Sequence, residues 1–585
     1  MLEDWQPMER WGGGASWALR LSITPPELGT AVPVPATTEW WVTVAPEYPA
    51  GDISFLPAIE NGLPGFFPHQ ARDFPDVRDG RPWRGAKICV ATNTENNLTN
   101  TGEVEPMDAE ERLTFQARRA VEWVRRASCG TLLGPGQPFE LPVFTMDPTR
   151  PTIAFWEGPE TLPAWREARH DHGVAELVHV GGRIAGPLAV RRFDTAGGIP
   201  VVGPPWGSYV AGAKTAGKAV WIRLPAMPVL PPWEAPITWG QMRAAVSAQG
   251  IDLDSILGPA IDVARRQRAK YLLVGFPAQE KVGGAVRMHW QPASLAVKAT
   301  GHRRRRGGPH RPKTSPWTFD YVVSTGDGSE IRWVWGANWH PDQIGSRGRF
   351  PPLLTERRAL LLGAGALGAT VAEMLARGGV RDLTVIDQDR LEAGNLVRHT
   401  LNLDYLGIGK AAALAHYLNR TNPNVTAHGF AARFPDGMSE EATRAVNAAD
   451  LVIDTTGDEA LLGALGMYPW AGRRRFVVLA LTYAARQLLA FVADGSAFPS
   501  AVYWERVGPW LADQRAGGFE MPHEAIGCWH PVFPARVDDM FLLAATATEA
   551  LAEWPAAAEP ILRVFERSKD ADSMPAMSAV NHDGR

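Results

Sequence analysis

The strongest constraint on the fold of this chain is a glycine-rich segment that lies between two apolar stretches. Residues 359–389 read ALLLGAGALGATVAEMLARGGVRDLTVIDQD, a pattern that predicts a strand, a tight turn, a helix and a second strand. Gly363, Gly365 and Gly368 form G-x-G-x-x-G, which would let the backbone approach a phosphate at the helix N-terminus. Asp387 ends the second strand, where a carboxylate can accept hydrogen bonds from ribose hydroxyls. We therefore predict an α/β, doubly wound, Rossmann-like domain that binds a nucleotide.

This glycine motif alone leaves the cofactor open. Nicotinamide and flavin enzymes share it, and a glycine-rich turn also occurs in unrelated α/β sheets. The residues that follow favour a triphosphate, because Arg and Lys neutralise phosphate oxygens and a carboxylate can hold Mg²⁺. Those residues are Asp389, Asn395 and Arg398 in GNLVRHT, Lys410 in GIGKAAALAHYLNRTNPNV, and Asp454 in the apolar strand ADLVIDTT (449–456). A dinucleotide oxidoreductase has no use for this set, so we predict ATP and Mg²⁺ as the cofactors.

Taken in order, these elements resemble the ThiF/MoeB-like superfamily, whose members adenylate the C-terminal glycine of a ubiquitin-like protein. The superfamily pattern runs GxGxxG, D-x-D, N-x-x-R, G-K, N-P and a strand-end Asp, and each element occurs here. The resemblance implies that Lys410 stabilises the pentavalent α-phosphate. It also implies that Asp387 binds ribose, that Asn395 and Arg398 bind phosphates, that Asp454 binds Mg²⁺, and that an upstream Arg, either Arg347 or Arg349 in GSRGRF, reaches the nucleotide.

The three cysteines, Cys89, Cys129 and Cys528, are too few for a disulfide framework, and none lies in a C-x-x-C pair. Cys528 lies in HEAIGCWHP (523–531), between His523 and His530, whose imidazoles could lower its pKa. The larger activating enzymes carry a Cys downstream of the adenylation core that takes the acyl group as a thioester, and Cys528 resembles it. The alternative is a buried structural Cys. Cys129 lies at the end of a helix predicted over about 108–129 and is expected to be structural.

The N-terminal region resembles ubiquitin-conjugating enzymes, an α+β fold. The resemblance rests on WWVTVAPEYPAGDISFLPA (40–58), FFPHQARD (66–73) and RGAKICVAT (84–92). It implies that Cys89 carries a thioester and that His69 belongs to the His-Pro-Asn element upstream. The Asn of that element is absent, since Gln70 and Ala71 follow His69. The donor that would stabilise the oxyanion is therefore open.

A chain of 585 residues is too long for one hydrophobic core. We predict a ubiquitin-conjugating-like domain over 1–145, an α/β linking domain over 146–340, a ThiF/MoeB-like adenylation domain with the catalytic cysteine region over 341–567, and a flexible tail over 568–585. In the linking domain, strands are predicted at 219–225 and 271–277 and a helix at about 240–268. Besides these elements, 87–92 is predicted as a strand of the N-terminal domain.

Charge and hydropathy exclude several classes of function. The 59 basic and 63 acidic residues leave a net charge of −4, which points to neither nucleic acid nor a membrane surface as a partner. No apolar run approaches the roughly 20 residues that span a bilayer. The N-terminus, MLEDWQPMERW, lacks the basic and apolar regions of a signal peptide, so a cytoplasmic protein is expected.

A conjugating-like domain ahead of an activating domain resembles the ubiquitin-transferase-like proteins of bacterial antiphage CBASS operons. The resemblance implies adenylation of a protein C-terminus, a thioester on Cys528, transfer to Cys89 and attack by a target amine. It implies a cGAS/DncV-like nucleotidyltransferase as the conjugated protein and a homodimer. Two alternatives stay open. The donor could be a dedicated bacterial ubiquitin-like protein, or residues 1–145 could be a docking module on an adenylating scaffold.

Overall fold

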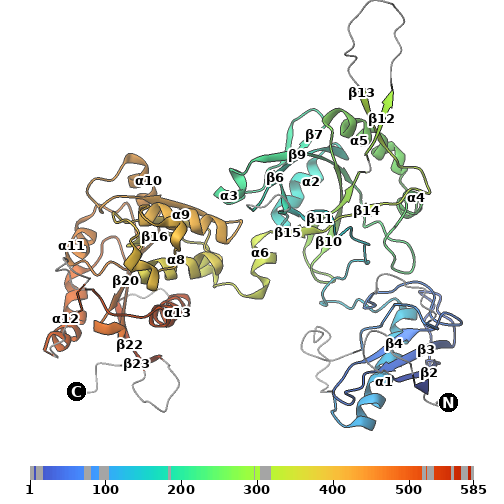
Figure 1. The fold of residues 1–585 in the computed structure, drawn as a ribbon, viewed down its shortest axis with the longest axis horizontal. Helices are drawn as coiled ribbons and strands as arrows, with labels where there is room; N and C mark the ends of the chain where they lie inside the picture. Colours follow the sequence, from blue (N-terminus) through green and yellow to red (C-terminus); the bar gives the residue numbers. More distant parts are fainter. Residues whose placement is uncertain are drawn as a thin grey trace, which may run out of the picture. The chain divides into compact units, whose positions relative to one another are not determined.

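The computed structural model describes residues 6–7, 17–71, 81–90, 105–181, 186–295, 297–302, 318–516, 522–523, 532–554, 559–567 and 577–580. The chain divides into two compact units. Unit 1 comprises Met1–Gly203 and Thr215–Ala337, and unit 2 comprises Pro204–Lys214 and Asn338–Arg585. Figure 1 shows both units. Of the described helices, none is long and apolar enough to cross a membrane.

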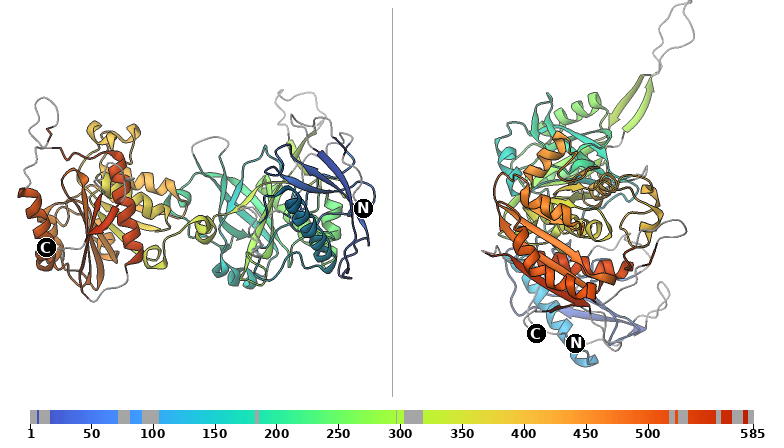
Figure 2. Two further views of the ribbon diagram at one scale, coloured as in Figure 1. Left: turned by 90° about the horizontal axis from the view of Figure 1, so that it is seen from below. Right: turned by 90° about the vertical axis from the view of Figure 1, so that its left-hand side faces the viewer.

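Unit 1 begins with a four-stranded antiparallel sheet in the order β1-β2-β3-β4, formed by β1 (Gln6–Pro7), β2 (Trp17–Ile23), β3 (Thr38–Val44) and β4 (Ile53–Pro57). The aromatic and β-branched residues at 40–46 predict a strand, and β3 confirms this prediction. Helix α1 (Ala109–Cys129) lies against this sheet (Figure 2), with the Trp123 ring edge-on to Trp40 at 6.3 Å between centroids. Asp108 caps its N-terminus, and Gly130 ends it with a left-handed φ of 65°. The predicted α+β architecture is confirmed.

The expected strand over 87–92 is wrong for the described residues. Residues 87–90 form no named strand, and only an isolated bridge joins Gln70 to Ile88. The side chain of Ile88 is fully buried, as an apolar strand residue would be, but its backbone N–H donates to the carbonyl of Phe55 at 3.1 Å. The backbone bonds of this segment go to separate parts of the chain, so no continuous ladder forms.

A nine-stranded mixed sheet forms the rest of unit 1, in the order β14-β11-β10-β9-β6-β7-β5-β15, with β8 paired to β7. Helices α4 and α5 cover one face, and α2 lies on the other, where Trp165, Trp221 and Trp290 pack together. The predicted strands at 219–225 and 271–277 are confirmed as β9 and β10. The bounds are β5 (Ile153–Phe155), α2 (Leu162–Glu167), β6 (His172–His179), β7 (Leu188–Thr195), β8 (Pro200–Val202), β9 (Thr215–Arg223), α4 (Trp239–Ser247), α5 (Leu253–Gln267), β10 (Tyr271–Gln279), β11 (Val286–Ser294), β14 (Arg332–Trp333) and β15 (Gly336–Asn338). A separate hairpin pairs β12 (Val297–His302) with β13 (Thr318–Val323).

The single helix expected at 240–268 is instead two helices, α4 and α5. Gly250 adopts a φ of 78°, which breaks the first helix, and the Asp252 side chain then caps the second by accepting from the backbone N–H of Asp254 at 3.1 Å. Both signals are present in the sequence, and they outweigh the continuous apolar periodicity on which the prediction rested.

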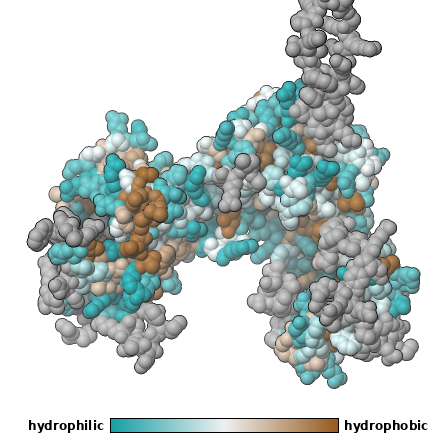
Figure 3. All heavy atoms as spheres, viewed as in Figure 1, coloured by the Kyte–Doolittle hydropathy of each residue, from teal (hydrophilic) through white to brown (hydrophobic). Residues whose placement is uncertain are grey.

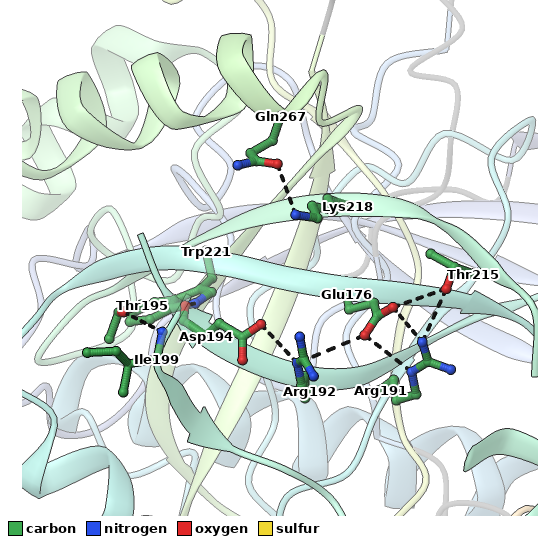
Figure 4. Close-up of polar contacts among 10 residues, drawn as sticks. All are labelled: Glu176, Arg191, Arg192, Asp194, Thr195, Ile199, Thr215, Lys218, Trp221 and Gln267. Atoms are coloured by element: carbon green, nitrogen blue, oxygen red, sulfur yellow. Dashed lines mark hydrogen bonds and ion pairs between the residues drawn. The ribbon is translucent and has the colours of Figure 1, made fainter. Parts of the chain in front are cut away.

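Charged side chains join three strands of this sheet (Figure 4). Glu176 on β6 accepts hydrogen bonds from Arg191 on β7 and, at 3.0 Å, from Thr215 on β9. Arg192 pairs with Asp194 at 2.9 Å. Because these charges are matched within the sheet, the cluster stabilises strand pairing, and each exposed pair contributes at most about 1 kcal/mol.

Unit 2 is a doubly wound sheet in the order β18-β17-β16-β19-β20-β21-β22-β23. The first five strands are parallel and the last three antiparallel. Helices α8, α9 and α13 cover one face, and α10, α11 and α12 cover the other. After β16 the chain forms β17 and β18 on one side of that strand, and then β19 and β20 on its other side. The topological switch point therefore lies between β16 and β19. The predicted Rossmann-like fold is confirmed.

The elements of unit 2 have the following bounds. They are α3 (Ser208–Ala211), α6 (Pro341–Ile344), α7 (Pro352–Thr355), β16 (Arg358–Leu362), α8 (Ala366–Arg377), β17 (Asp382–Ile386), α9 (Lys410–Thr421), β18 (Thr426–Phe430), α10 (Glu440–Ala448), β19 (Leu451–Asp454), α11 (Glu459–Met467), β20 (Arg474–Leu481), β21 (Gln487–Gly495), α12 (Ser500–Ala516), α13 (Val537–Glu553), β22 (Ile561–Arg567) and β23 (Met577–Val580). The division at Ala337 and Asn338 lies close to the boundary expected at 340. The predicted domain boundaries themselves stay predictions.

Candidate adenylation site and candidate thioester cysteine

The glycine loop lies at the switch point, between the end of β16 and the start of α8. Gly363 has a φ of 91°, and its carbonyl accepts a hydrogen bond from the Thr455 hydroxyl at 2.9 Å. A Cβ atom on Gly368 would come within 2.2 Å of that same carbonyl oxygen. A Cβ on Gly365 would meet no heavy atom within 4 Å. The three glycines therefore have different roles. Gly363 forms a left-handed turn, Gly368 allows α8 to pack closely, and Gly365 leaves open backbone next to a cavity.

This difference predicts opposite phenotypes for two alanine substitutions. Gly368→Ala forces its Cβ against backbone, so it should lower the stability of unit 2 by roughly 1–3 kcal/mol. Gly365→Ala meets open space and should leave the melting temperature nearly unchanged, while its methyl group occupies room that a phosphate needs. Thermal unfolding and ATP titration of the two variants, side by side, measure both effects. Equal melting temperatures would contradict this assignment of roles.

Two carboxylates and a lysine meet beside the loop, at the carboxyl end of β17. Asp387 accepts from the backbone N–H of Ala364 and from that of Asp389, both at 2.7 Å. Burial is the main cause that raises the pKa of Asp387. Lys410, the first residue of α9, places its Nζ 3.2 Å from Asp389 Oδ2. Lys410 is 21 positions from Asp389 in the sequence, and all three residues thus share one edge of the sheet.

Two adjoining cavities open at this edge. The smaller, of about 280 Å³, is lined by Gly363, Asp387 and Asp389 among others. The larger, of about 470 Å³, is lined by Asn395 and Arg398 and by apolar side chains. Gly365, Lys410, Thr455 and Thr456 line both cavities. Seven of the nine residues predicted for adenylation therefore line this pair of cavities, and Lys410 stands where they join.

Asp454 ends β19 on the other side of the switch point, and its side chain is 1% exposed. Its Oδ1 accepts from the backbone N–H of Thr456 at 2.9 Å and from the Thr456 hydroxyl at 2.7 Å. Its Oδ2 is buried and has no hydrogen-bond partner among the described residues. Burial raises the pKa of Asp454 to about 6. An unpartnered buried carboxylate oxygen fits a cation, because a cation would compensate the lost hydration.

The donor set fits Mg²⁺ in particular. Within the described ranges, no three His, Cys, Asp or Glu side chains cluster as metal ligands. Mg²⁺ is usually held by one or two carboxylates together with substrate phosphates and water, so a complete protein cage is not required. Asp454 would supply the protein ligand, with the phosphates of ATP as the others.

Arg398 and Asn395 are engaged by the protein itself. The Arg398 guanidinium donates to the carbonyl of Phe533 and, at 3.4 Å, to that of Ala535, and it lies 5.9 Å from the centre of the Phe533 ring. Burial lowers the pKa of Arg398. The Asn395 side chain accepts from the backbone N–H of Glu392 at 3.0 Å. Binding of phosphates by these two residues stays a prediction.

Of the two candidates for the upstream Arg, Arg349 pairs with Asp342 at 2.7 Å, next to Gly379. The approach of Arg347 or Arg349 to the nucleotide stays a prediction.

Sequence reasoning missed several residues of the site. Thr455 and Thr456 follow Asp454 directly and hold the glycine loop and the Asp454 carboxylate. His399 follows Arg398, and its Nε2 lies 2.8 Å from the carbonyl of Ala364 in the loop. A hydroxyl or imidazole next to a predicted ligand was the available signal, because such side chains commonly hydrogen-bond nearby backbone.

The cysteines occupy different environments. Cys89 is exposed, and its backbone N–H donates to the carbonyl of His69 at 2.8 Å. Partial burial, followed by the charge of Glu140, raises the pKa of the Cys89 thiol. Cys129 ends α1, half-buried, with its Sγ packed against Gly29. Cys528 and its neighbour His530 lie outside the described residues, so the prediction for Cys528 stays a prediction.

Both units contain residues that match a known protein family. A family model described as the Cap2 central linker domain matches residues 130–339, and one of the ThiF family matches residues 351–460. The ATP-dependent ubiquitin transferase-like protein Cap2 of Enterobacter hormaechei subsp. hoffmannii (strain UCI 50) is 32% identical over 543 residues, which cover 92% of this chain and 89% of that protein. The molybdopterin-synthase adenylyltransferase of Escherichia coli (strain K12) is 33% identical over 113 residues, covering 19% of this chain and 44% of that protein.

Among solved structures, E. coli MccB with ATP is 16% identical, covers 39% of this chain and 64% of that chain, and has a TM-score of 0.27. The family rests instead on the match to Cap2, which extends over nearly the full length of both chains. Together with the ThiF match, it makes the chain an ATP-dependent enzyme of the activating and conjugating type. The chain belongs to the family of Cap2 ATP-dependent ubiquitin transferase-like proteins.

Proposed function

We propose that this enzyme adenylates the C-terminal carboxylate of a protein, takes the acyl group onto Cys528, passes it to Cys89 and transfers it to a target amine. The proposed donor is a cGAS/DncV-like nucleotidyltransferase, and the proposed setting is CBASS antiphage defence in the cytoplasm. The observation that carries the adenylation step is the convergence of the glycine loop, Asp387 and Lys410 on one pair of cavities.

The smaller cavity would hold the nucleoside, with the ribose hydroxyls on Asp387, and the phosphates would extend across the glycine loop towards Lys410. A carboxylate oxygen of the donor attacks the α-phosphorus, a new P–O bond forms, and the bond to pyrophosphate breaks. Negative charge gathers on the α-phosphate in the transition state, where the Lys410 ammonium stabilises it. A Mg²⁺ ion on Asp454 would neutralise further charge on the triphosphate when bound.

The larger cavity suits the C-terminal tail of the donor. Leu479, Leu481, Phe533 and Met540 line it, which gives an apolar wall beside the phosphate position. An extended tail of small and apolar residues could lie along this wall with its carboxylate at Lys410. The sulfur of Cys528 would then attack the acyl-adenylate carbonyl and release AMP, after which Cys89 accepts the acyl group by thiol exchange.

Mass spectrometry of a trapped thioester tests this function. The full chain is incubated with ATP, Mg²⁺ and the donor, quenched in acid and digested without reductant. The expected product is a peptide containing Cys528 or Cys89 joined to the donor's C-terminus. A ubiquitin-like donor on the same cysteines would support the first alternative, and adenylate without any thioester would support the scaffold alternative.

We propose in addition that the enzyme is a homodimer. Unit 2 exposes several large apolar side chains close together in sequence, and Figure 3 shows apolar residues gathered on one face of this unit. Within this group Val397 is 71% exposed and Leu403 is 72% exposed, and both lie near Leu406 and Ile408 in the sequence. An apolar surface of this kind is typical of an interface. The test introduces a charge into this surface: Leu403→Glu should convert a dimer into a monomer in analytical ultracentrifugation. A monomeric parent chain would contradict this proposal.

A further inference from the structure

His69 lies directly beside Cys89. The isolated bridge between Gln70 and Ile88 aligns the two segments, and Cys89 donates its backbone N–H to the His69 carbonyl at 2.8 Å. His69 has a φ of 59°, a left-handed conformation that non-glycine residues rarely adopt and that occurs preferentially at functional sites. A residue with this uncommon backbone conformation thus lies in direct backbone contact with the proposed acyl carrier, Cys89.

Glu140 holds His69 at two points. Its Oε2 accepts the backbone N–H of His69 at 2.6 Å and lies 3.2 Å from Nδ1 of the ring. A carboxylate at Nδ1 favours the tautomer in which Nδ1 carries the proton, and this leaves the lone pair of Nε2 free to accept one. Both side chains are largely shielded, with 23% of His69 and 33% of Glu140 exposed.

The Nε2 atom of His69 is buried and has no hydrogen-bond partner among the residues that the structure describes. A buried polar atom without a partner typically costs about 1–3 kcal/mol. Its presence on a residue whose backbone binds that of Cys89 therefore calls for a reason. Burial is the main cause that raises the pKa of the Cys89 thiol, and the charge of Glu140 adds to it, while Lys87 and Arg119 oppose the rise.

We propose that His69, positioned by Glu140, is the proton acceptor for the amine that attacks the Cys89 thioester. The inference rests on the proposed function, because it requires an acyl group on Cys89. His69 Nε2 takes one proton from the lysine ammonium, and the neutral amine nitrogen then attacks the thioester carbonyl, so that a C–N bond forms. The C–S bond breaks, and the attacking nitrogen gives its second proton to the departing Cys89 sulfur. The products are an amide and the free thiol, and the His69 imidazolium releases its proton to water. Glu140 is a positioning residue and touches neither substrate.

A structural role is the competing explanation, in which the pair only fastens the segment around His69 to the start of the linking region. The two explanations predict different effects on two nucleophiles, of which only one needs a proton acceptor. Lysine amines are almost entirely protonated at neutral pH, since their pKa is about 10.4, and they need a base. Hydroxylamine is largely unprotonated at that pH and needs none. A structural defect would slow both reactions, and loss of the base would slow only the reaction with lysine.

The experiment uses the full chain with Cys129→Ala and Cys528→Ala, which leaves Cys89 as the only thiol. Cys89 is loaded chemically with acetylglycine from its thiophenyl ester, so the adenylation site is bypassed. Discharge to free lysine and to hydroxylamine is followed by intact-protein mass spectrometry, with acetylglycyl-glutathione as the uncatalysed reference. The variants are Glu140→Gln and His69→Gln. Glu234→Gln is the matched control, a neighbouring carboxylate that binds the backbone N–H of Phe66 at 3.2 Å.

We expect His69→Gln to slow discharge to lysine by about 100-fold or more and Glu140→Gln by about 10-fold, the range for loss of a general base and of its orienting partner. Discharge to hydroxylamine should stay within about two-fold in both, and Glu234→Gln should match the parent. Equal lysine rates in the parent and Glu140→Gln, or equal losses with both nucleophiles, would overturn the proton-acceptor assignment alone. A parent that reacts with lysine no faster than acetylglycyl-glutathione would instead overturn the proposed role of Cys89.

Discussion

Replacing Asp454 with Asn is expected to abolish ATP–pyrophosphate exchange and, at the same time, to stabilise the ligand-free protein at neutral pH. The first effect follows because the carboxylate is the proposed ligand of Mg²⁺, and loss of one charge in the transition state commonly costs about 3 kcal/mol or more, a rate loss of 100-fold or greater. The second follows from burial. An ionised carboxylate with an unpartnered Oδ2 is costly, and an amide of the same shape keeps Oδ1 for Thr456.

The pH window follows from the raised pKa. Burial lifts the pKa of Asp454 from 3.8 to about 6, so between these values the folded protein binds more protons than the unfolded chain. The free energy of unfolding therefore falls as the pH rises through this window, and the full loss, roughly 3 kcal/mol, is present above pH 6. The Asn variant lacks this loss. Its advantage should be largest at pH 8 and shrink towards pH 4.

Thermal unfolding of the ligand-free proteins at pH 8 and pH 5, together with hydrogen exchange of peptides from β19, measures the stability effect. Lys410→Ala is the matched control. This substitution removes a charge from the same site and should also abolish ATP–pyrophosphate exchange. The partner of Lys410, Asp389, is largely exposed, so no gain in stability is expected. If Asp454→Asn catalysed ATP–pyrophosphate exchange at a near-wild-type rate, the metal assignment would be overturned. Stability equal to that of the parent at pH 8 would contradict the burial argument.

Local sequence signals predicted the adenylation half of the chain well. The glycine turn, Asp387 and Asp454 each follow directly from an apolar strand, and parallel strands carry their carboxyl ends to one edge of a sheet, so short motifs far apart in sequence converge there. The strands β3, β9 and β10 were predictable for a related reason, because β-branched and aromatic residues concentrate in them.

Contacts between distant segments could not be predicted. Glu140 binds His69 across 71 positions, and Arg398 binds the carbonyl of Phe533 across 135 positions, and neither partner lies in a motif that names the other. The segment around Ile88 is extended and apolar, but its backbone partners are decided by tertiary packing. Pattern reasoning therefore located Cys89 and Arg398 and could not say which groups surround them.

The Cys89→Ala variant should form no conjugate at all, while it accumulates a single thioester on Cys528. The residues proposed for adenylation all lie in unit 2, so pyrophosphate exchange should be unchanged. The acyl group would then reach Cys528 and stop, because alanine offers no sulfur to accept it. Cys528→Ala should show the complementary result: exchange without a thioester on either cysteine. Non-reducing electrophoresis and mass spectrometry of acid-quenched reactions with ATP, Mg²⁺ and a cGAS/DncV-like nucleotidyltransferase distinguish these states.

Cys129→Ala is the control for both variants. Its sulfur packs against Gly29 at the end of α1, so the substitution removes a small buried contact and no proposed reactive group. It should conjugate at the rate of the parent, with at most a modest loss of stability. A conjugate formed by Cys89→Ala would show that the amine attacks the Cys528 thioester directly, and the N-terminal domain would then act by docking. An adduct on Cys129 would overturn the proposed order of the relay, because the acyl group would then pass through a thiol that is packed against Gly29 and has no assigned role.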